Sequence, residues 1–232
     1  MPITANNLLG IGIYSVPEAA RLAGVSPSRI RRWIRGYSFR SSGSLHKSPP
    51  VFKTQIPPTE KGELSLGFLD LIEVRFVNAF LSHGVTWPVI RRAESHARQL
   101  FATDHPFATK RFKTDGRKIF ATLRNRAASD PALLDLADNQ LAFNKLISPY
   151  LRGVEFEHDT AARWRPLGSK KRIVIDPQRS FGQPITDREG VPTAVLAAAF
   201  HAEGSEEAVA KTYRADLRSV RDALEFEQLL AA

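Results

Sequence analysis

The sequence predicts a mainly α-helical α+β fold, with a helix-turn-helix near the N-terminus, a β-hairpin region in the middle and a three-helix module at the C-terminus. Three observations predict this organisation. Two short capped helix patterns begin at Ser15, an Asp115-Gly116 pair lies between alternating apolar and polar residues, and three further helix patterns follow Pro192. A chain of 232 residues is long enough for more than one module. We expect domains at residues 1–101, 102–169 and 170–232.

The chain is basic overall, and its charge is unevenly distributed. The 33 Lys and Arg residues exceed the 24 Asp and Glu residues, which gives a net charge of +9. Residues 1–125 hold 19 basic and 8 acidic residues, a net of +11, whereas residues 126–232 hold 14 and 16, a net of −2. This asymmetry predicts that the first half binds a polyanion and that the second half does not.

The composition excludes several classes of protein. The chain has no cysteine, which excludes thiolate metal sites, thiol nucleophiles and a disulfide scaffold and fits a reducing compartment. The longest apolar run, Ala194–Phe200, is far shorter than the roughly 20 residues that span a bilayer. Residues 1–12 lack the basic flank and the apolar stretch of a signal peptide. We therefore expect a cytoplasmic protein with no membrane partner.

The segment Tyr14–Phe39 has the layout of a helix-turn-helix. Ser15 and Glu18 have the spacing of a capping box, which predicts the start of a first helix. Gly24 ends that helix in a tight turn, and Ser26 caps a second helix that begins with proline.

The second helix has one apolar stripe, formed by Ile30, Trp33 and Ile34. Its other positions carry serine or arginine and no acidic residue, although a solvated surface helix usually carries interspersed Glu. A helix fits the major groove of DNA, and guanidinium groups bind phosphates and the O6 and N7 atoms of guanine. We therefore predict DNA binding. The candidate contacts on this helix and the segment after it are Ser28, Arg29, Arg31, Arg32, Arg35, Tyr37, Lys47 and Lys53.

This segment resembles the N-terminal helix-turn-helix of the MerR family. In that family the second helix begins Ser-Pro and continues with an aliphatic residue, an arginine and an aromatic residue. Ser26-Pro27, Ile30, Arg31 and Trp33 fall on these positions. The resemblance implies a winged helix-turn-helix, in which a wing and a second pair of helices follow the recognition helix.

Residues 62–101 fit that second helix pair. Apolar residues recur at helical spacing over Leu66–Phe80, Gly84 ends this helix and Thr86 begins the next. The interval 40–58 is rich in Ser and Pro and lacks the wing arginine and tyrosine usual in the family. A wing and a mobile loop are therefore alternatives for this interval.

The middle region predicts a β-hairpin. Residues 108–123 alternate apolar and polar residues around Asp115-Gly116, and both turn positions of such a pair favour positive φ. Asp130-Pro131 opens a short apolar-periodic stretch, and residues 141–151 are ambiguous between strand and helix. We expect this region to join the two modules or to form a dimer interface.

The C-terminal region predicts one short strand and three helices. The strand covers residues 172–176, and the helices are expected at 193–203, 206–212 and 217–230. On the third helix we expect the apolar face to be buried and the carboxylates to be exposed. The expected buried residues are Val220, Ala223, Leu224 and Leu230, and the expected exposed residues are Asp222, Glu225 and Glu227.

This pattern resembles a small domain found in VapB-type antitoxins. The matching residues are Asp176-Pro177, Gly182, Pro184, Gly204-Ser205-Glu206-Glu207, Tyr213 and Ala223-Leu224. The family often has Gly-Thr-Arg before the first helix. This chain reads Arg188-Glu189-Gly190 there, so the role of that arginine is not carried over.

The resemblance implies an antitoxin that binds and silences a PIN-like ribonuclease toxin and represses its own operon. A folded inhibitor depends on a few buried apolar or aromatic anchors. The candidate toxin contacts are Phe181, Phe200, Tyr213 and Phe226, with membership of the core as the alternative for each. We also expect a homodimer on palindromic operator DNA, because one short recognition helix contacts too few base pairs.

Nothing in the sequence indicates catalysis. The six histidines are scattered, with no pair at i, i+4 and no carboxylate at metal-ligand spacing. The acidic residues occur singly on amphipathic patterns, whereas a metal-dependent ribonuclease needs a cluster of carboxylates. We therefore expect no catalytic residue, no metal site and no cofactor. The alternative function is a MerR-like transcriptional regulator that responds to a small molecule through residues 102–165 and has no toxin partner.

Overall fold

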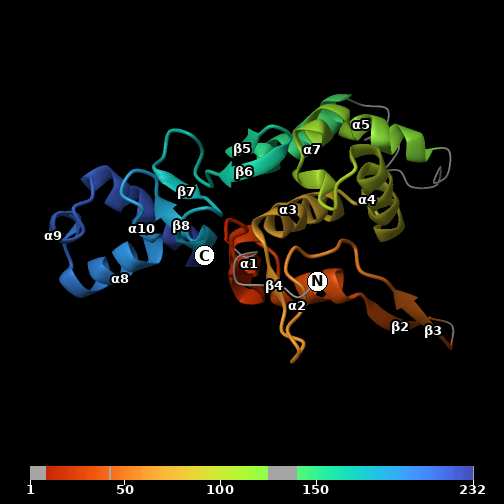
Figure 1. The fold of residues 1–232 in the computed structure, drawn as a ribbon, viewed down its shortest axis with the longest axis horizontal. Helices are drawn as coiled ribbons and strands as arrows, with labels where there is room; N and C mark the ends of the chain where they lie inside the picture. Colours follow the sequence, from red (N-terminus) through yellow and green to blue (C-terminus); the bar gives the residue numbers. More distant parts are fainter. Residues whose placement is uncertain (1–8, 42, 125–139, 232) are drawn as a thin grey trace. The chain divides into compact units, whose positions relative to one another are not determined.

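A computed structural model describes residues 9–41, 43–124 and 140–231 of the chain (Figure 1). The architecture is α+β with a helix-turn-helix near the N-terminus, as the sequence predicts. The described strands form two two-stranded sheets and one four-stranded sheet. None of the described helices is long and apolar enough to cross a membrane.

The chain divides into two compact units. The N-terminal unit comprises residues 14–151 together with 158–161. The C-terminal unit comprises the residues before Tyr14 together with 152–157 and 162–232. Residues 102–124 and 140–151, which we expected to belong to a middle region, are thus part of the N-terminal unit.

The helix-turn-helix consists of α1 (Val16–Ala23) and α2 (Pro27–Arg35). The predicted capping box is present: Glu18 N donates to Ser15 Oγ at 3.3 Å, and Ser15 N donates to Glu18 Oε2 at 2.7 Å. Gly24 ends α1 with a φ of 64°, a left-handed conformation that glycine adopts without steric cost. Local sequence therefore determines both ends of α1.

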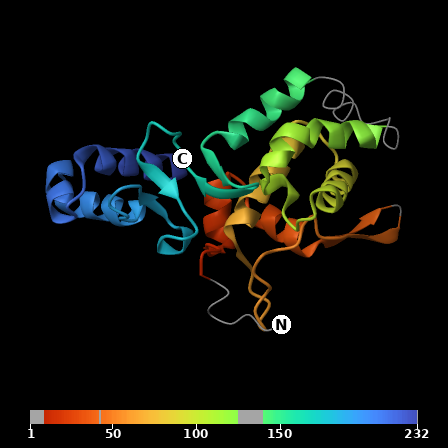
Figure 2. The ribbon, with the colours of Figure 1, turned by 45° about the horizontal axis from the view of Figure 1, so that its top comes forward.

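A hairpin of β2 (Tyr37–Ser41) and β3 (Ser44–Ser48) follows α2 directly and projects from the N-terminal unit (orange in Figure 2). For residues 40–58 the sequence allowed either a wing or a mobile loop. The structure has a β-hairpin in the first part of this interval. A second antiparallel pair joins β1 (Tyr14–Ser15) to β4 (Ser65–Leu66).

The helix pair predicted for residues 62–101 is confirmed as α3 (Phe68–Ser82) and α4 (Trp87–Phe101). Most of α3 is buried, and its charged residues Asp70 and Glu73 are fully buried with its apolar ones. A helix that is buried on most sides must be covered by other elements of the unit.

The predicted hairpin at residues 108–123 is wrong, because this segment forms a helix. A short 3₁₀ helix, η2 (Pro106–Ala108), leads into α5 (Lys110–Arg124), and α7 (Gln140–Leu151) resolves the strand-or-helix ambiguity of residues 141–151. The apolar residues that suggested alternation also recur at helical spacing and are buried. They are Phe112, Ile119, Phe120 and Leu123. The stretch opened by Asp130-Pro131 lies outside the described residues.

A cluster of phenylalanine rings holds these helices on α3. Neighbouring rings lie edge to face or tilted, with centroids 4.8–6.2 Å apart. Such pairs add about 0.5–1.5 kcal/mol each to the free energy of burial. The rings come from α3, η2, α5 and α7 and belong to Phe76, Phe80, Phe107, Phe112, Phe120 and Phe143.

Gly116 is part of this packing and not of a turn. A Cβ atom at Gly116 would lie 2.6 Å from Cζ of Phe143 and 3.2 Å from Cε2 of Phe112. The glycine allows α5 to approach these rings, which explains a weak helix former inside a helix.

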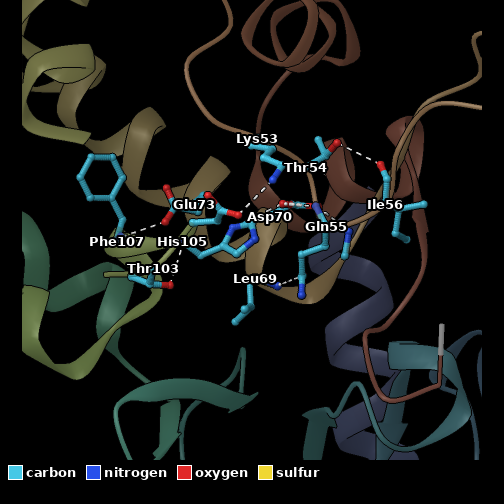
Figure 3. Close-up of polar contacts among 12 residues, drawn as sticks. Lys53, Thr54, Gln55, Ile56, Leu69, Asp70, Glu73, Thr103, His105 and Phe107 are labelled. Atoms are coloured by element: carbon cyan, nitrogen blue, oxygen red, sulfur yellow. Dashed lines mark hydrogen bonds and ion pairs between the residues drawn. The ribbon is translucent and has the colours of Figure 1, made fainter. Parts of the chain in front are cut away.

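Buried polar contacts of Asp70 fix the irregular segment between the hairpin and α3 (Figure 3). The Asp70 carboxylate accepts hydrogen bonds from Gln55 N at 3.0 and 3.1 Å and from Gly67 N at 2.8 Å. The Gln55 side chain in turn accepts a hydrogen bond from Leu69 N at 2.8 Å. These reciprocal bonds tie the segment around Gln55 to the N-terminus of α3. Burial raises the pKa of Asp70 to about 7 although the backbone hydrogen bonds from Gly67 and Gln55 lower it.

A second set of buried polar contacts joins α3 to η2 (Figure 3). Glu73 Oε1 accepts a hydrogen bond from Phe107 N at 2.8 Å, and Nδ1 of His105 lies 3.6 Å from Oδ1 of Asp70. Burial, followed by the neighbouring charge of Glu94, raises the pKa of Glu73 well above its ordinary value. Burial also lowers the pKa of His105 to about 4. Burial therefore favours the uncharged form of both groups: it shifts the Glu73 carboxyl group towards its protonated form, and His105 is neutral at neutral pH.

The C-terminal unit has three helices and most of a four-stranded sheet of order β5-β6-β7-β8, since the first two residues of β6 belong to the N-terminal unit. The strands are β5 (Val154–Glu157), β6 (Thr160–Trp164), β7 (Ile173–Ile175) and β8 (Pro184–Thr186), with η3 (Ser180–Gly182) before β8. The helices are α8 (Thr193–Glu203), α9 (Glu206–Thr212) and α10 (Leu217–Ala231). The predicted strand at 172–176 and the three predicted helices are confirmed, whereas β8 was not predicted.

The predicted exposure of Asp222 on α10 is wrong. Asp222 is buried, and its carboxylate accepts hydrogen bonds from Lys171 Nζ and from Arg172 N, both at 2.9 Å. The carboxylate therefore joins α10 to the start of β7. Of the residues expected to be buried, Val220 and Ala223 are buried, and Leu224 and Leu230 are half-buried.

Replacing Gly116 by Ala should destabilise the protein, although Ala is the better helix former by about 1 kcal/mol. The added methyl group requires Phe143 or Phe112 to move, so we expect a loss of about 1–3 kcal/mol in the free energy of unfolding, measured by denaturant titration. Ala121→Gly, at an exposed position of the same helix, measures helix propensity alone. A Gly116→Ala protein as stable as the unchanged protein would contradict the close packing.

The raised pKa of Glu73 makes stability depend on pH. The group stabilises the folded chain fully only below its unfolded pKa of about 4.3, and this contribution is lost as the pH rises towards the higher folded pKa. Glu73→Gln removes this titration and leaves Asp70 and His105 in place. Between about pH 5 and about pH 8, the melting temperature of the unchanged protein should fall more than that of the variant. Parallel curves would show that Glu73 is not held protonated.

Candidate DNA interface

The exposed face of α2 consists of arginine and serine. Ile30, Trp33 and Ile34 are buried against the rest of the N-terminal unit, as predicted. The remaining candidate residues of this helix are all exposed. They are Ser28, Arg29, Arg31, Arg32 and Arg35. One fold element thus presents five of the eight predicted DNA contacts on a common surface.

Trp33 fixes the orientation of α2. Its ring is 3% exposed and packs edge to face on Trp87 of α4, with the ring centroids 5.6 Å apart. The Arg29 guanidinium lies 5.6 Å from the centroid of the Trp33 ring, which is within the range of a cation–π interaction. Burial of Trp33 therefore points the arginine face away from the core.

Tyr37, at the start of β2, adjoins this arginine face. The Arg32 guanidinium lies 5.7 Å from the centroid of the Tyr37 ring, and the tyrosine is half-buried. Lys47 is exposed on β3, but it pairs with Ser38, whereas Tyr37 pairs with Ser48. Successive residues of a strand point to opposite faces, so the side chains of Tyr37 and Lys47 lie on opposite faces of the hairpin.

Lys53 lies apart from the hairpin. Its Nζ atom forms an ion pair with Asp104 at 3.2 Å, and its side chain is 71% exposed. Lys53 and Arg35 both line a hollow of about 490 Å³, together with Arg98 of α4. The Arg35 side chain also donates a hydrogen bond to the Gly62 carbonyl. These contacts hold Arg35 and Lys53 at the edge of the arginine face.

Arg91 of α4 belongs to the same region and was not among the predicted contacts. Its Nη2 atom donates hydrogen bonds to Ser48 Oγ at 2.6 Å and to the Pro49 carbonyl at 2.9 Å. Its guanidinium lies 5.6 Å from the centroid of the Trp87 ring. The i, i+4 spacing of Trp87 and Arg91 is visible in the sequence, but the hairpin partner of Arg91 is distant in sequence.

The predicted toxin contacts of the C-terminal unit are not equally accessible. Phe181 is 62% exposed and has a φ of 53°, which is strained for a bulky residue. Ile13 N donates a hydrogen bond to the Phe181 carbonyl at 2.9 Å. Phe200 and Tyr213 are half-buried, whereas Phe226 is 3% exposed and belongs to the core. Among the described residues, no group of histidine and carboxylate side chains is arranged to hold a metal ion.

Comparison with known proteins supports the interpretation of the N-terminal unit as a DNA-binding module. Residues 12–94 match a family model described as "Putative DNA-binding HTH domain", a range that contains α1, α2, the hairpin and α3. Residues 12–94 are therefore similar to a DNA-binding helix-turn-helix domain.

Two similar proteins match nearly the whole chain, and not only its helix-turn-helix. A Mycobacterium tuberculosis protein named "Putative antitoxin VapB45" is 26% identical in an alignment of 224 positions that covers 93% of this chain and 93% of that protein. The crystal structure of Rv2018 from Mycobacterium tuberculosis matches with a TM-score of 0.71 and 25% identity, covering 93% of this chain and 99% of that chain. Both matches include the C-terminal unit as well as the helix-turn-helix.

Truncation of Trp33 should test the placement of α2. Trp33→Ala leaves a cavity beside Trp87 and should lower the free energy of unfolding by about 3–5 kcal/mol. Arg31→Ala, on the exposed face of the same helix, should leave thermal stability nearly unchanged. If Trp33→Ala kept its melting temperature, the buried face of α2 would be assigned wrongly.

Proposed function

We propose that this protein is the DNA-binding antitoxin of a type II toxin–antitoxin pair and that it is not an enzyme. Similarity over 93% of the chain to a protein named as an antitoxin carries the proposal. The matched helix-turn-helix model and the exposed arginine face of α2 support its DNA-binding half. The charge asymmetry supports separate partners for the two parts of the chain.

On DNA, α2 enters the major groove as the recognition helix of a MerR-like winged helix-turn-helix, with the β2–β3 hairpin as its wing. The proposed contacts are Ser28, Arg29, Arg31, Arg32, Arg35 and Tyr37. The protein acts as a homodimer on a palindromic operator and thereby represses its own operon. Two-fold symmetry doubles the base contacts that a single short helix can make.

The C-terminal unit binds a PIN-like ribonuclease toxin. Interfaces depend on a few aromatic anchors that become buried in the complex. Phe181 is the best candidate because it is exposed and held in a strained left-handed conformation, and Phe200 and Tyr213 are partly accessible. Phe226 is left out because it is buried in the core.

DNA binding should depend steeply on salt. If each protomer of the dimer neutralises about four phosphates, log affinity should fall with log salt with a slope near −7. Arg31→Ala or Arg35→Ala should cost about 1–3 kcal/mol if the side chain contacts a base. Combined replacement of Arg29, Arg31, Arg32 and Arg35 should abolish specific binding, measured by fluorescence anisotropy on the region upstream of the gene. Arg188→Ala, in the C-terminal unit, is the control that should bind normally.

Toxin inhibition should depend on Phe181. The full-length chain is produced together with the product of the neighbouring gene, purified as a complex and tested for ribonuclease activity. We expect Phe181→Ala to release ribonuclease activity without lowering the melting temperature, because the side chain is exposed. Tyr213→Phe is a conservative control. If no complex forms with the unchanged chain, the antitoxin half of the proposal is wrong, whatever the outcome of the DNA assay.

A further inference from the structure

The β2–β3 hairpin has two different faces. Its antiparallel register pairs Phe39 with His46 and Arg40 with Leu45. Directly opposed residues share a face, so Phe39 and His46 lie with Tyr37 on one face. Arg40, Leu45 and Lys47 lie on the other. The first is called the aromatic face below, and it consists of Tyr37, Phe39 and His46.

Side chains of the aromatic face form a continuous row, in which Phe39 and His46 are exposed and Tyr37 is half-buried. The rings of Tyr37 and Phe39 are 5.9 Å apart between centroids, and those of Phe39 and His46 are stacked at 5.4 Å. Phe39 is 44% exposed and His46 is exposed. The row therefore exposes apolar ring surface to solvent on a hairpin that projects from the unit.

The aromatic face continues the arginine face of α2. Arg32 lies about 200° around the helix from the buried Ile30, at the centre of the exposed side. The same Arg32 guanidinium lies over the Tyr37 ring, at 5.7 Å from its centroid. A surface that binds α2 from the solvent side would thus meet Arg32 first and then the row of rings.

The base of the hairpin is held to the body of the unit on this same face. Ser48, the strand partner of Tyr37, is buried and accepts the hydrogen bond from Arg91. Arg91 lies over Trp87, which packs on Trp33 of α2. One chain of contacts therefore sets the direction of the hairpin relative to the recognition helix.

We propose that the hairpin contacts the backbone of duplex DNA with its aromatic face, through Phe39 and His46 next to Tyr37, and that Lys47 on the opposite face is not a contact. This inference rests on the proposed DNA binding by α2 and adds two contacts that sequence patterns did not indicate. The Tyr37 hydroxyl and the His46 imidazole donate to phosphate oxygens, and the Phe39 ring packs against deoxyribose. Because these contacts do not read bases, they strengthen binding to any sequence.

Two matched double variants of the full-length chain test the inference. Phe39→Ala with His46→Ala alters the aromatic face, and Arg40→Ala with Lys47→Ala alters the opposite face of the same hairpin. Binding to a labelled mixed-sequence duplex of about 30 base pairs is measured by fluorescence anisotropy over a series of salt concentrations at a fixed pH. Circular dichroism and light scattering confirm fold and oligomeric state.

The aromatic-face variant should bind about tenfold more weakly with an unchanged salt slope, because the proposed contacts are apolar packing and hydrogen bonds and not ion pairs with phosphate. The opposite-face variant should lose less than about threefold. The reverse order, with a shallower slope for Arg40→Ala and Lys47→Ala, would overturn the proposal. So would unchanged binding by both variants, or loss of the dimer in the aromatic-face variant, which would make the row a protein contact.

A variant with the four α2 arginines replaced separates this inference from the proposed function. If that variant binds as the unchanged protein does, the proposed recognition helix is wrong and the aromatic face has no interface to continue. If it loses binding while both hairpin variants retain it, the recognition helix stands and only the aromatic-face contact is refuted.

Discussion

Burial of α3 on nearly every side is the constraint on which the N-terminal unit depends. A helix with so much apolar surface is stable only when other elements cover it. The phenylalanine rings of η2, α5 and α7 pack on its Phe76 and Phe80, either directly or through one another. Because protein interiors are close-packed, this covering sets where α4 and α5 can lie. The position of α4 in turn determines where Trp87 and Arg91 meet the helix-turn-helix.

Burying α3 also requires partners for its carboxylates. Unpaired buried polar groups cost about 1–3 kcal/mol each, so Asp70 and Glu73 accept hydrogen bonds from backbone N–H groups of distant segments. The Asp70 bonds give the irregular chain around Gln55 a defined path between the hairpin and α3, and the Glu73 bond joins α3 to η2. The polar contacts therefore help to specify the geometry of these connecting segments.

Two aromatic contacts connect this scaffold to the proposed DNA-binding surface. Trp33 on Trp87 orients α2, and Arg32 over Tyr37 brings the hairpin beside it. The arginine side chains of α2 stay in solvent because the other side of the helix is filled by Ile30, Trp33 and Ile34. The proposed affinity for DNA thus comes from exposed arginines whose placement depends on buried aromatic rings. Mutation of the arginines should change DNA affinity, and mutation of the rings should change stability.

The sequence by itself determined the features that depend on local interactions. The capping box of Ser15 and Glu18, the turn at Gly24 and the three C-terminal helices follow from contacts within a few residues of the chain, and the arginine face of α2 follows from helical periodicity. Tertiary structure decided the features that depend on distant partners. From the sequence alone, Gly116 is consistent with a turn or with a tight helix contact, and only the position of Phe143 distinguishes the two. Helical periodicity likewise places Asp222 on the surface, whereas in the structure it is buried and bound by Lys171 and Arg172. The two faces of the hairpin were likewise not predictable, because strand register is set by pairing between segments and by packing of its base on Arg91.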